Sequence, residues 1–207
     1  MIFERRMKMD LCSSKTRENL MRAYAGETQA RERYDIAQEK LKAQKQFFLA
    51  DLFRFTAKQE KEHARIFYEH LQSGCAGQTT VNAQYPVDEQ SCDTACLLQN
   101  AAKHEKDEST DIYPEFARTA REEGFAQIAQ DFENIAGIEK THGERFERFA
   151  QLARENKLYS SDESTSWICT NCGYIYQGTQ VPQNCPVCHG EQGYYIRLDM
   201  ADWGLYK

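Results

Sequence analysis

The sequence predicts an all-α four-helix bundle with one long crossover, followed by a small β-rich metal-binding domain. Three observations indicate this fold class. Four stretches place apolar residues three and four positions apart, which puts them on one face of a helix. Residues 75–90 have no such period, so they are expected to form a long connection. After Trp167 the composition changes to Cys, Gly, Pro and Tyr, which indicates a separate small domain.

The first two helices are expected to form a hairpin. Ser13 or Ser14 is the candidate N-cap of a helix that runs to about Lys45. The second helix covers about 47–72 and ends near Gly74, because glycine is typical of helix C-termini.

The third and fourth helices are expected to form a second hairpin. The third begins near Ser91 and runs to about Glu123, and Pro114 is expected to kink or break it. Gly124 marks a tight turn, after which the fourth helix runs to about Asn156.

These elements predict three segments along the chain. The bundle covers residues 14–156, a polar linker covers 157–165, and the small metal domain covers 166–207. Residues 1–13 are short and mixed in composition, and we expect them to be loosely attached.

The composition excludes several classes of protein. The chain has 207 residues, a formal charge of −6 and a mean hydropathy of −0.77. It has no stretch apolar enough to span a membrane and no basic patch for a nucleic acid. The segment Met1–Arg6 lacks the apolar region of a secretory signal, so we expect a cytoplasmic protein. Its eight cysteines are therefore expected to be thiols and metal ligands before disulfides.

Two helices carry the same Glu-x-x-His motif in the middle of an apolar stripe. Glu60 and His63 interrupt the stripe of the second helix, and Glu139 and His142 interrupt that of the fourth. Burying an unpaired carboxylate is costly, so acids in apolar stripes need a shared cation.

The other two helices supply further acids, Glu27 on the first and Glu105 and Glu108 on the third. With a rise of 1.5 Å per residue, the path from Glu27 to the turn near Lys45 and back to Glu60 returns to nearly the same height. Two divalent metals nearly balance five carboxylates, and such ligands with two imidazoles suit iron or manganese. The sequence thus predicts a dinuclear site; exposed polar positions on amphipathic helices are the alternative.

The two hairpins correspond to each other as a repeat. Glu27 and Glu105 are 78 positions apart, whereas Tyr34 and Tyr113 are 79 apart, so the second hairpin contains one inserted residue. Both tyrosines fall near the face that carries the acids. They either pack in the core or donate hydrogen bonds to the metal ligands.

Four cysteines form two Cys-x-x-Cys pairs in the small domain, Cys169 with Cys172 and Cys185 with Cys188. Two such turns that face each other make a tetrahedral metal site. Four sulfur ligands suit zinc, which would be structural, and iron, which would carry single electrons. The other four cysteines are expected to be ordinary half-buried thiols: Cys12, Cys75, Cys92 and Cys96. Cys92 and Cys96 share one helix face at i, i+4, so binding of a metal or oxidation is the alternative for this pair.

Taken together, these residues resemble the rubrerythrin family over nearly the whole chain after the first dozen residues. The motifs that carry the resemblance are Ala25-Gly26-Glu27, Glu60-Lys61-Glu62-His63, Glu105 with Glu108, Tyr113-Pro114, Glu139 with His142, and the cysteine pairs that follow Trp167. His104 and His189 stand where the family pattern has glycine.

The resemblance implies a ferritin-like di-iron bundle joined to a rubredoxin-like domain, and the activity of a peroxide reductase. The metal ligands would be Glu27, Glu60, Glu105, Glu139 and His142 for two non-haem irons, while His63 and Glu108 exchange at one of them. Tyr34 and Tyr113 would donate hydrogen bonds to these ligands. The resemblance also implies a homodimer.

An iron in the four-cysteine site would return electrons from an external donor, either rubredoxin or a nicotinamide-dependent reductase. Two other functions compete with the reduction of hydrogen peroxide. One is a ferritin-like ferroxidase that handles iron, and the other is a structural module with a zinc ribbon that binds a partner. Glu108 and the aromatic residues near the cysteines favour the peroxidase.

Overall fold

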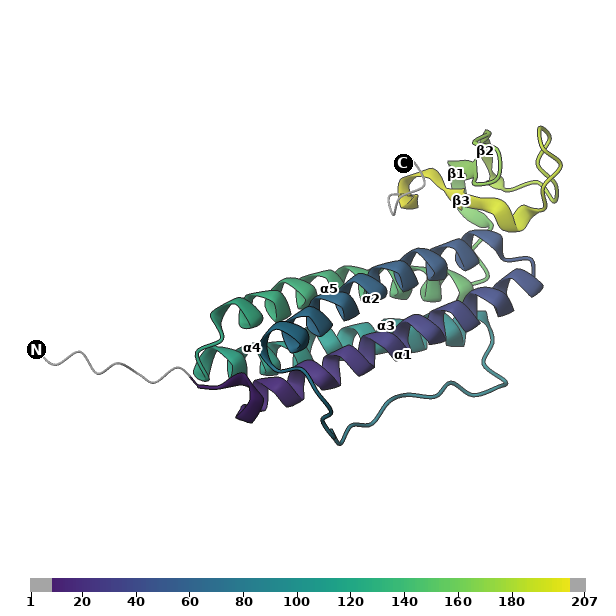
Figure 1. Ribbon diagram of the computed structural model, residues 1–207. Coiled ribbons are helices and arrows are strands. Elements are labelled where there is room, and N and C mark those ends of the chain that lie inside the picture. The colour runs from purple at the N-terminus through teal and green to yellow at the C-terminus, as the bar shows by residue number, and fades with distance from the viewer. Residues whose placement is uncertain (1–8, 202–207) are drawn as a thin grey trace, which may run out of the picture. The chain divides into compact units, whose positions relative to one another are not determined.

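The computed structural model describes residues 9–201 and confirms the predicted fold class. Figure 1 shows its helices as coiled ribbons and its strands as arrows. The helices are α1 (Lys15–Ala43), α2 (Phe47–Gly74), α3 (Thr94–Asp107), α4 (Tyr113–Glu122) and α5 (Ala126–Arg154). The strands are β1 (Ser160–Cys169), β2 (Ile175–Gln180) and β3 (Tyr195–Arg197). Among residues 9–201, no helix is both long and apolar enough to span a lipid bilayer.

The helix ends follow local sequence signals. The hydroxyl of Ser14 accepts a hydrogen bond from the N–H of Arg17 at 3.1 Å, which confirms Ser14 as the N-cap of α1. The turn after α1 contains Lys45 at a φ of 60°, and the turn before α5 contains Gly124 at a φ of 88°. Both residues adopt the left-handed conformation that ends a helix.

One turn of π-helix, η2 (Glu108–Ile112), joins α3 to α4. The N–H of Tyr113 donates to the carbonyl oxygen of Glu108, five residues earlier. The expected interruption of the third helix is therefore present, but the irregular turn precedes Pro114, which lies in the first turn of α4. Proline lacks an N–H and its ring clashes with the carbonyl four residues before it, so the chain widens there.

The π turn also explains the one-residue insertion in the second hairpin. A π turn holds one more residue than an α turn, so it absorbs the insertion without rotating the following residues off the buried face. Tyr113 is accordingly 1% exposed, and its counterpart Tyr34 is 3% exposed. Both tyrosines lie in the core, as the repeat predicts.

The described residues form two compact units, and α1, α2, α3 and α5 contribute to both. The first unit contains residues up to 30, 60–87 and 101–144. Its core includes Phe67, Tyr113 and Phe132, whose rings contact one another at centroid distances of 4.9 to 5.8 Å. Phe67 and Phe132 lie on α2 and α5, the helices that carry the Glu-x-x-His motifs, and Tyr113 lies on α4.

The second unit contains residues 31–59, 88–100 and those from 145 onwards. In its helical part, the ring of Tyr34 packs against Phe53 and Phe146, with centroids 5.5 and 5.4 Å away. In its sheet, β1 is the central strand and pairs with β2 and β3 in antiparallel fashion. Trp167 is fully buried there, and its indole N–H donates to the carbonyl oxygen of Gly178 at 2.9 Å.

The sheet begins earlier than the sequence indicates. Residues 160–165, expected to belong to the polar linker, form the first part of β1 instead. Ser160 pairs with Gln180 and Thr165 pairs with Gly178, with an irregular register between them. Serine and acidic residues have weak strand propensity, but hydrogen bonds to β2 compensate, which is a tertiary effect.

The four cysteines expected to be free thiols form two disulfides, so that expectation was wrong. Cys12 bonds Cys75, and Cys92 bonds Cys96, with Cα atoms 5.1 and 5.2 Å apart. The short helix η1 (Leu11–Ser13) is thereby attached to the end of α2, where the side chain of Leu11 lies against Gly74. Residues 11–13 are thus firmly held, whereas residues 1–8 lie outside the described part of the chain.

Candidate metal centres

Six ionisable side chains from four helices converge in the first unit. They form two overlapping groups of potential metal ligands, within each of which the ligand atoms lie within 4.8 Å of one another. The first group is Glu27, Glu60, His63 and Glu139, and the second is Glu60, Glu105, Glu139 and His142. The two Glu-x-x-His motifs and their partner acids therefore meet as the sequence predicts.

Glu60 and Glu139 belong to both groups, and each points one carboxylate oxygen at each histidine. For His63, the Nδ1 atom lies 3.0 Å from Glu60 Oε2 and 2.8 Å from Glu139 Oε1. For His142, the Nδ1 atom lies 3.1 Å from Glu60 Oε1 and 2.8 Å from Glu139 Oε2. Each of these two carboxylates therefore offers one oxygen to each group of potential ligands.

The terminal positions are held by one further acid on each side. His63 Nδ1 lies 3.7 Å from Glu27 Oε2, and His142 Nδ1 lies 3.6 Å from Glu105 Oε2. The two imidazole rings are nearly parallel, with centroids 5.9 Å apart. Each group thus has one histidine, one carboxylate of its own and the two carboxylates common to both groups.

Hydrogen bonding alone does not account for this convergence. One Nδ1 atom carries at most one proton, yet each Nδ1 faces three carboxylates. Several buried oxygens have no hydrogen-bond partner among the described residues, namely Glu27 Oε2, Glu60 Oε1 and both oxygens of Glu139. Buried, unsatisfied carboxylate oxygens aimed at one another fit divalent cations between them.

The electrostatics of the metal-free site lead to the same conclusion. All six side chains are between 0 and 4% exposed, so water cannot solvate their charges. Burial and the nearby charge of Glu60 raise the pKa of Glu105 to about 8. Burial also favours the neutral form of Glu60, but the imidazoles of His142 and His63 outweigh it and lower that pKa to about 2. Protons thus compensate the charge that metals would otherwise neutralise.

Burial likewise favours the neutral form of both histidines, but the carboxylates reverse the effect. Glu139 and Glu27, with Glu60, raise the pKa of His63, and Glu60 does the same for His142. Burial, reinforced by the charge of Glu139, raises the pKa of Glu27 well above its ordinary value. The cluster is therefore a set of ligands that holds protons when it holds no metal.

Tyr113 and Gly143 support the ligands from neighbouring positions. The hydroxyl of Tyr113 donates a hydrogen bond to Glu27 Oε1, in addition to the packing of its ring in the core. A Cβ atom at Gly143 would lie 3.3 Å from Glu105 Cβ and 3.4 Å from the carbonyl oxygen of Ala102, so glycine lets α5 approach α3 closely. We did not single out Gly143 from the sequence, although its place directly after His142 was a usable signal.

Glu108 stands apart from the converged ligands. It is half-buried and belongs to neither group of ligand atoms. Its Oε1 atom lies 3.8 Å from the position of a Cβ on Gly26, and the ring of Tyr85 lies 3.7 Å from the same position. Burial, together with the charge of Glu27, raises the pKa of Glu108 well above its ordinary value. His63 is therefore in place as a ligand here, while Glu108 lies outside the cluster.

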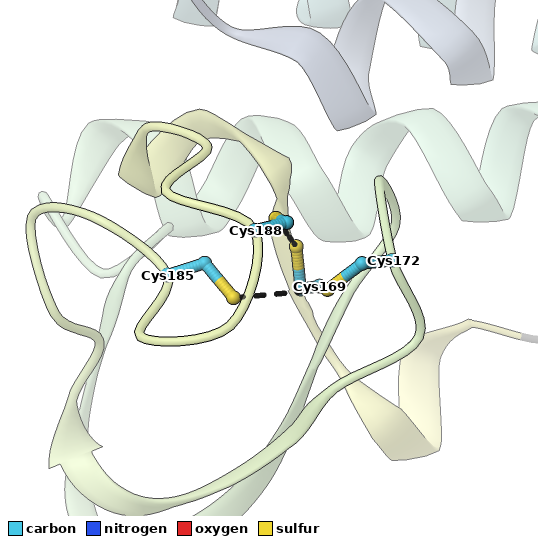
Figure 2. Close-up of side chains that lie close together, drawn as sticks. All are labelled: Cys169, Cys172, Cys185 and Cys188. Carbon is cyan, nitrogen blue, oxygen red and sulfur yellow. Dashed lines mark hydrogen bonds between the residues drawn. The ribbon is translucent and has the colours of Figure 1, made fainter.

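The second centre is the four-cysteine cage of the small domain, shown in Figure 2. Cys169, Cys172, Cys185 and Cys188 have their sulfurs within 4.8 Å of one another. The Cys169–Cys188 and Cys172–Cys185 sulfur pairs are 3.8 and 3.7 Å apart. Around a metal with bonds of about 2.3 Å to sulfur, a tetrahedron has edges of about 3.8 Å. The cage therefore fits a tetrahedral metal site.

Each cysteine pair lies on a turn of the same design. The N–H of Gly173 donates to the carbonyl oxygen of Cys169 at 2.8 Å, and the N–H of His189 donates to that of Cys185 at 2.9 Å. Gly173 and His189 both have positive φ values, 80° and 61°. His189 therefore adopts the left-handed conformation in which glycine is unstrained, and the hydrogen bond of its turn is kept.

Hydrogen bonds also reach the sulfurs of the cage. The side-chain amide of Asn171 donates to Cys188 Sγ at 3.4 Å. The N–H of Gly190, helped by Asn171, lowers the pKa of the Cys188 thiol, whereas burial raises the pKa of Cys169 to about 12. Thiolates are the ligand form, so the metal must displace the proton of Cys169.

Two family models match the chain. The model described as rubrerythrin covers residues 18–150, and that described as the rubredoxin-like domain of rubrerythrin covers residues 167–195. The chain is 41% identical to a rubrerythrin of Clostridium perfringens over 89% of its own length and 95% of the relative's. It is 37% identical to a rubrerythrin of Nitratidesulfovibrio vulgaris, with 91% and 96% coverage.

Solved structures agree with these matches. A partially reduced state of nigerythrin aligns with a TM-score of 0.60 and 28% identity, covering 89% of this chain and 90% of that one. A bacterioferritin of Desulfovibrio desulfuricans aligns with a TM-score of 0.62 over 69% of this chain and 82% of that one. Its identity of 24% supports the helical fold alone. The bundle thus contains a ferritin-like di-iron site, and the small domain contains a rubredoxin-like four-cysteine site.

Loading of the di-iron site is expected to release protons. The proton on Glu105 is bound below its raised pKa of about 8 and lost above it, and a ligating carboxylate must be free of it. The apparent affinity for Mn²⁺ should therefore rise as pH increases from about 6 to about 8. Titration of the metal-free chain with Mn²⁺ in weak buffer measures the released protons. The variant Glu144→Gln, at an exposed position on α5, should release as many, and binding without proton release would contradict the prediction.

His189→Gly is expected to stabilise the small domain. A non-glycine residue at a φ of 61° is strained by roughly 1 kcal/mol, which glycine avoids. Thermal unfolding of the metal-loaded chain, followed by its metal–thiolate absorption, measures the change. Gly173→Ala, at a φ of 80° on the matching turn, should shift the midpoint in the opposite direction. Equal midpoints for His189→Gly and the unaltered chain would show that the strain is offset elsewhere.

Proposed function

Since the chain belongs to the rubrerythrin family, we propose that it reduces hydrogen peroxide to water at its di-iron centre, with electrons relayed through an iron in the four-cysteine cage. The observation that carries the proposal is the presence of two unlike metal sites in one chain. One is a buried carboxylate and histidine cluster, and the other is a sulfur cage with a half-exposed rim. The first suits two-electron chemistry on oxygen, and the second suits transfer of single electrons.

The reaction consumes two electrons and two protons for each peroxide and forms two molecules of water. When bound, the two irons supply the electrons and act as Lewis acids on the peroxide oxygens. The chain would supply the geometry, because Glu60 and Glu139 each point one oxygen at His63 and the other at His142. Tyr113 holds Glu27 in orientation through its hydroxyl. Tyr34 stays a predicted hydrogen-bond partner of the ligands, beside its packing against Phe53 and Phe146.

His63 and Glu108 are proposed to exchange at one metal position. His63 Nδ1 faces the carboxylates of Glu27, Glu60 and Glu139, while Glu108 lies beside Gly26. A half-buried carboxylate with a raised pKa is suited to hold a proton near the centre and to move in as a ligand after losing it. In the repeat, the position on α1 that corresponds to Glu108 is Ala30, which has no carboxylate. The two metal positions are therefore unequal.

The four-cysteine cage is proposed as the entry point for electrons. The sulfur of Cys172 belongs to an exposed residue, and that of Cys188 to a half-buried one, so a donor can approach this side of the cage. The donor is an external rubredoxin or a nicotinamide-dependent reductase, and the working form is a homodimer in the cytoplasm. These three points rest on the family resemblance and stay predictions.

The metal content of the protein distinguishes the proposed peroxidase from two alternatives, a ferroxidase and a structural module. A ferroxidase would need the di-iron site but no electron carrier, and a structural module would hold zinc in the cage. About three irons per chain, with a coloured oxidised form that reductant bleaches, supports the relay. Zinc in the cage would contradict it and leave the alternatives.

Cys172→Ser is expected to stop turnover while keeping a single reaction with peroxide. Loss of one sulfur ligand disables the cage, but the di-iron cluster shares no residue with it. Steady-state peroxide reduction should therefore fall to background. A stopped-flow experiment on the chemically reduced protein should still show one oxidation of the di-iron site. Unchanged steady-state turnover would rule out the relay.

Glu108→Ala is expected to slow the reaction with peroxide at least about tenfold, a modest loss for a residue that moves a proton. Both irons should remain bound, because Glu108 lies outside both groups of converged ligands. Stopped-flow rates and iron analysis give the two readouts. Glu115→Ala, at an exposed position in the first turn of α4, is the matched control and should react at the normal rate. A normal rate for Glu108→Ala would remove its proposed role.

A further inference from the structure

The disulfide between Cys92 and Cys96 lies outside both metal centres, at the start of α3. We propose that this pair is a thiol–disulfide exchange site, oxidised by hydrogen peroxide and reduced by a small external dithiol. The two residues are four positions apart, and Cys92 lies in the turn that leads into the helix. The site is thus a compact dithiol that no metal ligand shares.

The two cysteine residues differ in exposure in the way that exchange requires. Cys92 is 4% exposed, whereas Cys96 is half-buried in the first turn of α3. An incoming thiolate therefore attacks the sulfur of Cys96, and Cys92 leaves as the thiolate. An accessible sulfur paired with a buried one is the arrangement in which one sulfur is attacked and the other departs inside the protein.

Asn100 is placed to stabilise the departing thiolate. Its side-chain nitrogen lies 3.6 Å from Cys92 Sγ and 3.8 Å from Cys96 Sγ, within reach of both. The same nitrogen donates to Asp88 Oδ1 at 2.7 Å, which fixes the orientation of the amide. When the disulfide breaks, the amide of Asn100 can donate a hydrogen bond to whichever sulfur becomes the thiolate. Hydrogen bonds to charged groups are stronger than those between neutral groups.

The surrounding charges are mixed, with positive groups close to the backbone of the pair. The ammonium group of Lys40 donates to the carbonyl oxygens of Cys92 and Gln90. The N-terminus of α3 also favours a thiolate in its first turn. The carboxylate of Asp93, which accepts a hydrogen bond from the N–H of Cys96 at 2.8 Å, opposes these effects because its charge is negative. The positive groups and the carboxylate of Asp93 therefore offset each other, and the local charge does not prevent the approach of a thiolate.

A purely structural role fits the other disulfide better. Cys12–Cys75 joins residues 63 positions apart, whereas Cys92–Cys96 joins residues four apart. The stabilisation by a disulfide grows with the length of the loop that it closes, so the short bond contributes less. The turn at Cys92 is already held by backbone hydrogen bonds from Cys92 to Glu89 and from Leu97 to Asp93. A role in thiol–disulfide exchange therefore explains the Cys92–Cys96 disulfide better than a role in stabilising the fold does.

The cycle balances in atoms and electrons. In reduction, one thiolate of the dithiol attacks Cys96 Sγ and displaces Cys92, and its second thiolate then releases Cys96. The external dithiol loses two electrons and two protons, which the pair gains. In oxidation, the Cys96 thiolate attacks one oxygen of hydrogen peroxide, the O–O bond breaks, and a sulfenic acid forms while hydroxide leaves and is protonated to water. The Cys92 thiol then attacks the sulfur of Cys96 and displaces the hydroxyl as a second water.

The test uses the full, iron-loaded chain in its oxidised form, whose di-iron site has no electrons to give to peroxide. Dithiothreitol is added under native conditions, samples are alkylated over time, and peptide masses identify the free thiols. We expect Cys92 and Cys96 to be reduced while the thermal unfolding midpoint stays unchanged, and one equivalent of hydrogen peroxide to restore the bond. Reduction of Cys12–Cys75 should instead lower that midpoint.

Two variants decide the role of the surroundings. Asn100→Ala should slow reduction about tenfold, because a hydrogen bond to a thiolate is lost. Ser91→Ala is the matched control, since its exposed hydroxyl donates to Glu89 and its loss should leave the rate unchanged. In Cys92→Ser, peroxide should leave a sulfenic acid on Cys96 that a 1,3-dione reagent traps.

Three results would overturn the proposal. In the first, dithiothreitol reduces the bond only after the protein unfolds. In the second, Asn100→Ala and the unaltered chain are reduced at equal rates. In the third, the thiols of Cys92 and Cys96 stay free after hydrogen peroxide is added. Because the readout is the mass of alkylated peptides, it does not depend on peroxide turnover at the irons. Failure of the exchange site and failure of the proposed peroxidase are therefore distinguishable.

Discussion

The structure depends on one electrostatic constraint, the burial of four carboxylates and two imidazoles at a single point in the helical bundle. Isolated carboxylates do not remain charged in an apolar interior, so their charge must be met by cations or by protons. The raised pKa of Glu105 and the lowered pKa of Glu60 show that protons and imidazolium groups partly meet it without metal. Two irons meet it with the charge and the ligand geometry that the cluster already has.

Much of the surrounding packing serves to keep that cluster in register. Gly143 brings α5 close to α3 beside Glu105, and the π turn after α3 returns Tyr113 to the buried face. Tyr113 then reaches across to Glu27, far away in the sequence. A one-residue slip at the π turn would rotate Tyr113 by about a hundred degrees around its helix and remove this contact. The insertion is therefore part of how the site is built.

The cysteines divide into three sets with different physical roles. The four-cysteine cage has sulfurs at tetrahedral spacing, which makes it a metal site. Cys12–Cys75 closes a long loop and attaches the first short helix to α2. Cys92–Cys96 closes a short loop beside an amide that reaches both sulfurs, which is a chemical more than a structural arrangement. The spacing of the cysteines predicted the cage, since two paired turns are a strong signal, whereas the i, i+4 spacing of Cys92 and Cys96 gave oxidation only as an alternative.

The sequence by itself determined the helices, the two Glu-x-x-His motifs and the cysteine cage, because these depend on spacings of a few residues within one element. It also indicated the dinuclear site, since acids in apolar stripes need a partner. Tertiary structure decided that Glu60 and Glu139 each face both histidines, that Glu108 stands aside, and that residues 160–165 join a sheet. It also decided the pairing of Cys12 with Cys75. Such features depend on which atoms of distant segments meet, and local periodicity carries no information about that.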